Sequence, residues 1–235
     1  MMRQTLDAGL PELGLDLPES ARQTLCDFGA AVIKQNEVMN LTAITEPREI
    51  VYKHFVDSLL LLKAIELPQG ASLIDVGTGA GFPGMPLRIL KDDFDLTLLD
   101  SLGKRVNWLQ EVCDELQLKR VACVHARAEE FAMQHREQFD IATSRAVAQL
   151  SILSELCLPL IKVGGQFAAM KSVDTEDEIA AAKSAIKTLG GHIVKVEDYT
   201  IPTSDVVHRL VIVEKVSPTP RAYPRAFAKI KKAPL

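Results

Sequence analysis

Strand and helix patterns alternate along the chain from residue 71 onward, and this alternation limits the possible folds more than any other feature of the sequence. Apolar strand runs are expected at residues 71–76, 95–100, 120–125, 139–144 and 165–171, with helical stretches near 84–91, 102–117, 149–161 and 175–189. The strand runs are apolar along most of their length, which indicates a sheet covered on both faces. Such an alternation predicts a parallel sheet with helices on both sides.

The end of this region departs from the alternation. Residues 191–215 hold two strand runs joined by a short, turn-rich link that contains Pro202. The link has no room for a crossover helix, so the two strands must be antiparallel. We therefore expect an α/β fold in which a mostly parallel seven-stranded sheet is closed by an antiparallel hairpin. This Rossmann-like arrangement is typical of class I methyltransferases that use S-adenosylmethionine, whereas a nicotinamide-binding domain does not usually end in this way.

Two helices are expected before the first strand. Apolar residues recur at helical spacing over 19–38 and again from Pro47 to about residue 65, and proline suits the first turn of a helix. We divide the chain into an N-terminal helical extension packed on the core at 1–70, a methyltransferase core at 71–216 and a basic C-terminal tail at 217–235.

A glycine-rich loop, DVGTGAGFPG at 75–84, follows the first strand run. Its acid and three alternating glycines, Asp75, Gly77, Gly79 and Gly81, match the cofactor loop of the S-adenosylmethionine-dependent methyltransferases without a shift. Glycine permits positive φ and lets a ligand approach the backbone. A carboxylate suits a cofactor that has a sulfonium and an ammonium but no phosphate. The dinucleotide fingerprint G-x-G-x-x-G fits only in a later register, which begins at Gly79 and has a proline inside it.

Further candidates lie after the other strand runs. Asp100 ends the second run, where an acid can accept hydrogen bonds from ribose hydroxyls in either a NAD site or an S-adenosylmethionine site. Ala128 and Glu129 follow the third run and are candidates to read an adenine edge, although the start of an ordinary helix is the simpler interpretation of them. Arg145 follows the fourth run and Lys171 ends the fifth. Both are positioning candidates that would meet the methionine carboxylate or the methyl acceptor.

The charge of the chain is distributed unevenly. The 235 residues have a net charge of −4, but residues 216–235 hold five basic residues and no acid. The remainder therefore has 22 basic and 31 acidic residues, a net charge of −9. An acidic body with a basic, proline-rich tail suggests a polyanionic partner, and a disordered, solvated terminus is the alternative interpretation. The RNA-binding candidates in the tail are Arg221, Tyr223, Arg225, Lys229, Lys231 and Lys232.

Other features restrict the compartment and the chemistry. The four cysteines are scattered, which indicates reduced thiols and no zinc site. The longest apolar runs are too short to span a bilayer, and the first residues lack the apolar core of a secretory signal. We therefore expect a cytoplasmic protein that acts as a monomer, with no metal and no membrane partner. The five histidines have no motif partner in the strand-end loops, so no catalytic residue is assigned.

Most of the chain resembles the RsmG (GidB) family. The resemblance rests on the segments NLTAI at 40–44, HFVDSL at 54–59, DVGTGAGFPG at 75–84, LLDSLGKR at 98–105, RAEEF at 127–131, SRAVA at 144–148 and the basic tail. The tail keeps Tyr223-Pro224-Arg225 but has Ala228 and Ile230 where the family has glycine and proline. This resemblance implies a methyltransferase that transfers the methyl group of S-adenosylmethionine to N7 of a guanine in the 530 loop (position 527) of 16S ribosomal RNA. The implied partner is 16S rRNA or the small ribosomal subunit.

The resemblance also implies cofactor contacts at Gly77, Phe82, Ala128, Glu129 and Arg145, to which the fold argument adds the remaining loop residues and the acid at position 100. Three other functions stay open on the sequence. They are an S-adenosylmethionine-dependent methyltransferase acting on a protein or small molecule, an NAD-dependent oxidoreductase, and an RNA-binding module without enzymatic activity. The terminal hairpin and the loop acid disfavour the oxidoreductase, and the intact cofactor loop disfavours the module.

Overall fold

The computed structural model describes residues 1–12, 14, 17–145, 148–173 and 175–235. One seven-stranded sheet runs through the molecule in the order β3-β2-β1-β4-β5-β7-β6. Its strands are β1 (Ser72–Val76), β2 (Asp95–Asp100), β3 (Val121–His125), β4 (Phe139–Ser144), β5 (Ile161–Ser172), β6 (Gly191–Thr200) and β7 (Val207–Lys215). The first five strands pair in parallel, and β7 pairs antiparallel with both β5 and β6. The predicted sheet with its closing hairpin is confirmed.

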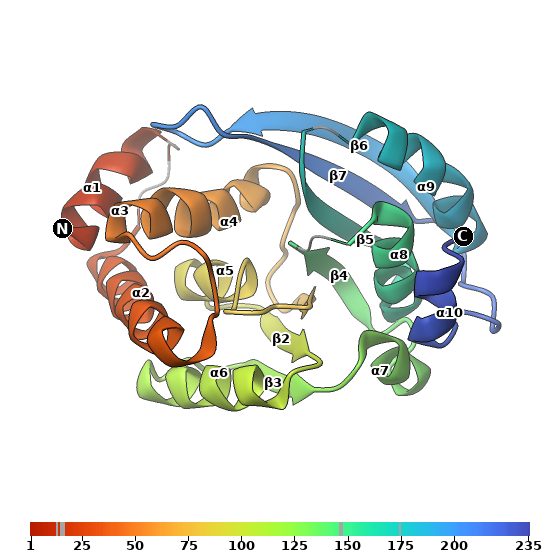
Figure 1. The fold of residues 1–235 in the computed structure, drawn as a ribbon, viewed down its shortest axis with the longest axis horizontal. Helices are drawn as coiled ribbons and strands as arrows, with labels where there is room; N and C mark the ends of the chain where they lie inside the picture. The colour runs from red at the N-terminus through yellow and green to blue at the C-terminus, as the bar shows by residue number, and fades with distance from the viewer. Residues whose placement is uncertain (13, 15–16, 146–147, 174) are drawn as a thin grey trace.

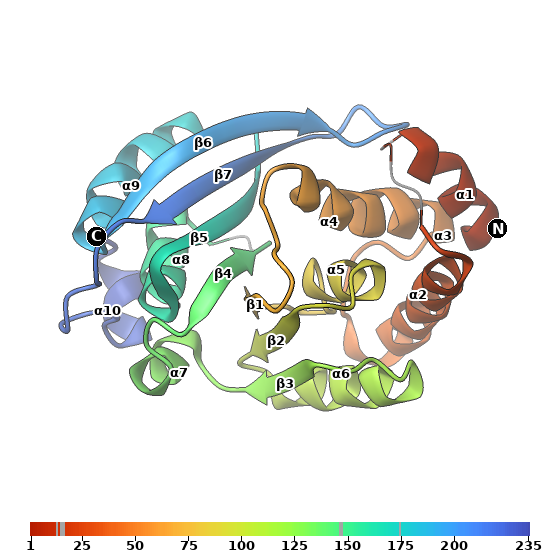
Figure 2. The same cartoon turned by 180° about the vertical axis from the view of Figure 1, so that it is seen from behind.

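Helices cover both faces of the sheet, as the apolar strands require. The connecting helices are α5 (Gly84–Leu90), α6 (Gly103–Glu115), α7 (Ala128–Gln134), α8 (Leu150–Cys157) and α9 (Glu176–Thr188). Successive strand side chains point to opposite faces. Leu73 of β1 accordingly packs with α5, α6 and the N-terminal helices, whereas Ile74 packs with α7, α8 and α9. Figures 1 and 2 show these two helical layers on either side of the strands.

The N-terminal segment is helical, as expected, and shares a core with the sheet. It contains α1 (Met2–Glu12), α2 (Glu19–Met39), α3 (Pro47–Ile50), a π-helical segment (Val51–Val56), α4 (Asp57–Leu60) and a 3₁₀ turn (Leu61–Lys63). The prediction missed α1, and it treated the second helix as one uniform element from Pro47. The π-helical segment packs Val51 and Phe55 into the core while His54 turns toward the strand ends. This placement of His54 matters for the site.

The C-terminal segment packs on the body of the protein and ends in a short helix that the sequence did not predict, α10 (Phe227–Lys232). Arg136 donates to the backbone carbonyls of Tyr223 and Pro220. Ile230, which stands where the resembling family has proline, is completely buried. The last twenty residues are therefore a folded part of the molecule. Within the part of the chain described above, no helix is both long enough and apolar enough to cross a membrane.

Candidate active site

The loop after β1 is shaped by a buried acid. The carboxylate of Asp75 is inaccessible, and its Oδ2 accepts hydrogen bonds from the Thr78 hydroxyl at 2.7 Å and from the Gly84 amide at 2.9 Å. Burial raises the pKa of Asp75 to about 6, and these hydrogen bonds oppose the shift. Its Oδ1 has no hydrogen-bond partner among the described residues. Asp75 therefore lies on the buried side of the loop and fixes its conformation through the bonds to Thr78 and Gly84.

Two of the loop glycines leave the backbone open to a ligand. Gly77 and Gly79 have φ angles of +71° and +60°. A Cβ atom added to Gly77 would have no neighbour within 4 Å, and one added to Gly79 would meet only a backbone oxygen at 4.0 Å. Gly81 differs, because a Cβ there would lie 2.6 Å from the Met85 side chain. Gly77 and Gly79 therefore offer bare backbone to a cofactor, whereas Gly81 allows tight packing of the loop on α5.

Asp100 joins the end of β2 to this loop. Its Oδ2 accepts a hydrogen bond from the Gly79 amide at 2.9 Å, and its Oδ1 accepts one from the Leu102 amide at 2.9 Å. The side chain is almost fully buried but lines a cavity. A carboxylate held in this way keeps lone pairs for ribose hydroxyls. Its position at a strand's carboxyl end matches the general location of nucleotide sites in open α/β sheets.

A cavity of about 230 Å³ brings together four of the nine predicted cofactor residues. Gly77, Asp100, Ala128 and Glu129 all line it. The other lining side chains are mainly apolar and come from the ends of β1 and β2 and from α8, together with Phe227 of α10. Polar groups at the ends of neighbouring strands and an apolar lining suit a nucleoside with a ribose and a flat purine. The cavity therefore suits the adenosine part of S-adenosylmethionine.

Arg145 lines a second cavity of about 220 Å³, together with His54, Asp57 and His208. The Arg145 guanidinium lies 5.0 Å from the centre of the buried Phe82 ring. It donates hydrogen bonds to Asp57 Oδ2 at 2.9 Å and to His54 Nδ1 at 2.9 Å. The sequence analysis placed Phe82 and Arg145 among the cofactor contacts. The structure instead puts Arg145 in the wall of the second cavity, with its guanidinium against the Phe82 ring.

Every hydrogen-bonding atom of the His54 and Asp57 side chains is engaged. Arginine can only donate, so His54 Nδ1 must accept from Arg145, and Nε2 then donates to the Thr42 hydroxyl at 2.9 Å. Asp57 Oδ1 accepts from the Tyr199 hydroxyl at 2.8 Å and from His208 Nδ1 at 2.9 Å. These hydrogen bonds fix the orientation of Arg145.

The charges of this network explain its protonation states. Burial and the positive charge of Arg145 lower the pKa of His54 to about 3, so its ring is neutral. Burial alone would raise the pKa of Asp57, but the hydrogen bond from His208 and the charge of Arg145 outweigh it and keep that pKa below its ordinary value. A buried carboxylate thus faces the Arg145 cation and the two hydrogen-bond donors Tyr199 and His208.

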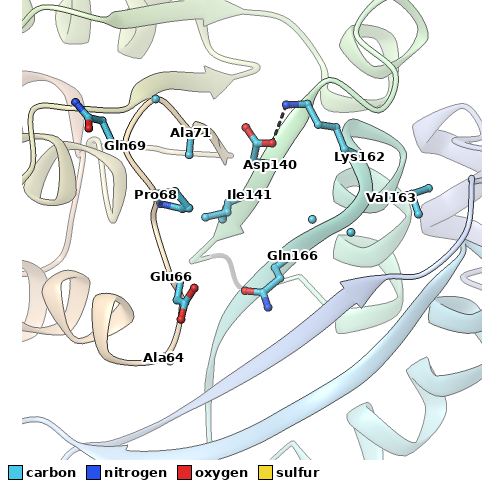
Figure 3. Close-up of a pocket in the computed structure, with 13 residues that line it drawn as sticks. Ala64, Glu66, Pro68, Gln69, Ala71, Asp140, Ile141, Lys162, Val163 and Gln166 are labelled. Carbon is cyan, nitrogen blue, oxygen red and sulfur yellow. Dashed lines mark hydrogen bonds and ion pairs between the residues drawn. The ribbon is translucent and has the colours of Figure 1, made fainter.

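Lys171 and a third, larger cavity lie outside these two sites. Lys171 donates to the Ala148 carbonyl at 2.7 Å and pairs with Glu178, and it lines neither cavity. A larger cavity of about 750 Å³ lies at the amino-terminal ends of β1 and β4, where Asp140 pairs with Lys162 (Figure 3). Ligands of open α/β sheets bind at the carboxyl ends of the strands. We therefore place the active site at the two smaller cavities.

The basic residues of the C-terminal segment divide into two groups. Arg225 binds the buried carboxylate of Glu155 through its backbone amide and its guanidinium, and its guanidinium lies over the Tyr223 ring. Tyr223 is half-buried against the core. These two RNA-binding candidates are thus used inside the fold. The exposed candidates are Arg221, Lys229, Lys231 and Lys232.

Two parts of the site escaped the sequence analysis. Phe227 was not singled out, because the sequence around it has no motif that indicates ligand binding. Tyr199 and His208 meet Asp57 only through the closing hairpin, more than 140 positions away along the chain. HFVDSL drew attention to His54, but its local pattern fits a helix in the core. Ala146 and Val147 of the SRAVA segment lie outside the described residues.

A mostly parallel seven-stranded sheet with a terminal antiparallel hairpin, an open glycine loop and an acid that joins the end of β2 to this loop defines a class I S-adenosylmethionine-dependent methyltransferase fold. The fold resembles a precorrin-6y C5,15-methyltransferase from Geobacter metallireducens (TM-score 0.54, 13% identity, 67% of this chain and 87% of that one). It also resembles M. jannaschii TYW2, solved in complex with AdoMet (TM-score 0.52, 14% identity, 68% of this chain and 77% of that one).

The family model described as rRNA small subunit methyltransferase G matches residues 21–207, and the chain belongs to this family. A protein named ribosomal RNA small subunit methyltransferase G from Clostridium botulinum (strain ATCC 19397 / Type A) is 46% identical over 98% of this chain and 97% of its own length. The protein of the same name from Alkaliphilus metalliredigens is 45% identical over 99% of this chain and 98% of its own length. The resemblance seen in the sequence motifs is confirmed.

Proposed function

We propose that this protein transfers the methyl group of S-adenosylmethionine to N7 of a guanine in the 530 loop of small-subunit ribosomal RNA. Family membership supports the RNA substrate and the methyl donor. The single structural observation behind the choice of acceptor atom is that the His54 and Asp57 side chains in the second cavity are both fully engaged in hydrogen bonds, so neither is free to take a proton from an acceptor.

An acceptor without a proton suits such a cavity. Guanine N7 has an in-plane lone pair and no hydrogen, so no base has to remove a proton as the new C–N bond forms. Bound S-adenosylmethionine supplies a methyl group on a sulfonium, and the electron pair of the broken C–S bond stays on sulfur while the purine becomes positive. The protein then contributes mainly by aligning the two partners, which can supply roughly 7–11 kcal/mol of the barrier.

The residues take distinct parts in this proposal. Gly77, Asp100, Ala128 and Glu129 would contact the adenosine and ribose directly, since they line the first cavity. Gly79 would add open backbone, and the loop would keep its shape through Asp75 and Gly81. Phe82 and Arg145 would border the methionine end of the cofactor and the acceptor base. The division into an extension at 1–70, a core at 71–216 and a tail at 217–235 stays a prediction.

RNA binding would rest on the exposed part of the C-terminal segment. Arg221, Lys229, Lys231 and Lys232 would contact phosphates, while Tyr223 and Arg225 would hold the segment in place. We further propose that the protein works as a monomer without a metal ion, in the cytoplasm, where ribosomal subunits are assembled. The alternative acceptors, a protein or a small molecule, have no specific observation in their favour.

The decisive experiment incubates the protein with methyl-labelled S-adenosylmethionine and small subunits that lack their modifications, and then maps the label. We expect label on guanine N7 in the 530 loop. Naked 16S rRNA assayed in parallel tells whether the assembled subunit is required. Measurable cofactor binding with no label on any ribosomal RNA would refute the proposed acceptor and redirect the search to proteins and small molecules.

A further inference from the structure

Phe227 of the C-terminal helix lines the cofactor cavity, although the segment around it has the composition of an RNA-binding tail. It is half-buried at the first position of α10. Of the described residues that line this cavity, it is the only aromatic one. The Arg127 guanidinium, on the segment that leads into α7, lies 5.7 Å from the centre of its ring. The ring is thus held at the wall of a cavity that otherwise has only aliphatic and polar lining.

The helix that presents this ring is fixed to the body at several points. Arg225, two residues before Phe227, makes three hydrogen bonds to the completely buried Glu155 of α8. Ile230, three residues after it, is completely buried, so the two anchors lie on either side of the ring. Arg136 holds the preceding backbone at Tyr223 and Pro220. A wall anchored in this way is available before any RNA arrives and needs no reordering to meet a ligand.

We propose that α10 is part of the cofactor site and that Phe227 packs against the adenosine portion of S-adenosylmethionine. This inference rests on the proposed function, since it needs the first cavity to hold that cofactor. Purines stack well on aromatic rings because both have flat, polarisable faces. The lysines at positions 229, 231 and 232 are exposed on the same helix. One short element would then contact the cofactor through its ring and RNA through its lysines.

The test measures the dissociation constants of S-adenosylhomocysteine and of 5′-methylthioadenosine by calorimetry, for the full-length protein without RNA. Phe227→Ala should weaken both ligands about tenfold, because a base–aromatic contact is lost and both ligands contain adenosine. Met133→Ala is the matched control, since it truncates an exposed apolar side chain on the neighbouring α7. Its affinities should equal those of the wild type.

The outcomes separate this inference from the proposed function. A wild-type protein that binds neither ligand would refute the proposed function itself. Wild-type binding with Phe227→Ala affinities within twofold would overturn only the role of Phe227, as would a loss confined to S-adenosylhomocysteine. If Phe227→Ala lowers the melting temperature, Phe227→Leu decides, because it keeps apolar bulk without the ring. We expect it to weaken both ligands by about threefold, and unchanged affinity would overturn the stacking contact.

Discussion

The two cavities at the carboxyl ends of the strands are built in different ways. The cofactor cavity is lined largely by residues at or just after the carboxyl ends of β1, β2 and β3, with further lining from α8 and from Phe227. The second cavity joins the N-terminal helices to β4 and to the closing hairpin, and its central carboxylate, Asp57, binds partners from β6 and β7. A cofactor site can thus be recognised from a local motif, whereas an acceptor site of this kind exists only after distant segments have packed.

Removing the carboxylate at the centre of the second cavity should have the largest effect. Asp57→Ala leaves Arg145, Tyr199 and His208 without their acceptor, and breaking a buried pair costs about 3–5 kcal/mol. Urea unfolding measures this loss. Asp95→Ala, which removes an exposed partner of Arg120, should cost at most about 1 kcal/mol.

The same variant tests whether the two cavities are separable. Asp57→Ala should abolish methyl transfer but keep the affinity for 5′-methylthioadenosine, which occupies only the first cavity. A parallel loss of this affinity would show that the network around Asp57 also shapes the cofactor loop. The two cavities would then not be separable.

Substitution of Gly79 in the loop after β1 should strongly weaken cofactor binding. Gly79→Val places a branched side chain at φ +60° in the space reserved for the cofactor, so the affinity for S-adenosylhomocysteine should fall by about 100-fold or more, or about 2.7 kcal/mol. Gly70→Val is the matched control, with φ +77° and an equally open Cβ position at the opposite edge of the sheet. Both variants should lose similar stability, and equal ligand affinity in the two would contradict the open-backbone interpretation.

The buried imidazole gives the second cavity a pH dependence. The pKa of His54 is lowered from about 6.5 to about 3 by burial and by Arg145. Between these two pH values the imidazole is therefore protonated in the unfolded chain and neutral in the native state. Stability attributable to His54 is present above pH 6.5 and is lost as the pH falls. Between pH 7 and pH 5 this loss amounts to about 2 kcal/mol.

Urea unfolding of His54→Gln and wild type across this range checks the expectation. The stability advantage of the wild type over the variant should shrink as the pH falls. His192→Gln, at an exposed position on β6, should follow the wild type throughout. A constant difference between wild type and His54→Gln would show that the imidazole does not titrate on unfolding.

The smallest effect is expected on the exposed face of α10. The double variant Lys231→Ala, Lys232→Ala should bind RNA more weakly and reduce the slope of log affinity against log salt concentration by roughly 1.4–1.8, at 0.7–0.9 for each lost phosphate contact. Its affinity for 5′-methylthioadenosine should stay the same. Point variants are preferable to deleting residues 217–235, since deletion would also remove buried Ile230 and the partner of Glu155. An unchanged salt slope would contradict RNA binding by this face.

The sequence alone determined the alternation of strands and helices, the closing hairpin, the glycine-rich loop with Gly77 and Gly79 after the first strand, and the acid Asp100 at the end of the second. It could do so because strand and helix periodicity, glycine conformation and the position of an acid at a strand end are local properties. Only the tertiary structure decided that Asp75 lies beneath its loop, that Arg145 faces His54 and Asp57, and that Arg225 and Tyr223 belong to the fold while Phe227 reaches the cofactor cavity. These outcomes depend on which distant side chains a buried charge or ring contacts once the core has formed. Local sequence patterns cannot predict such contacts.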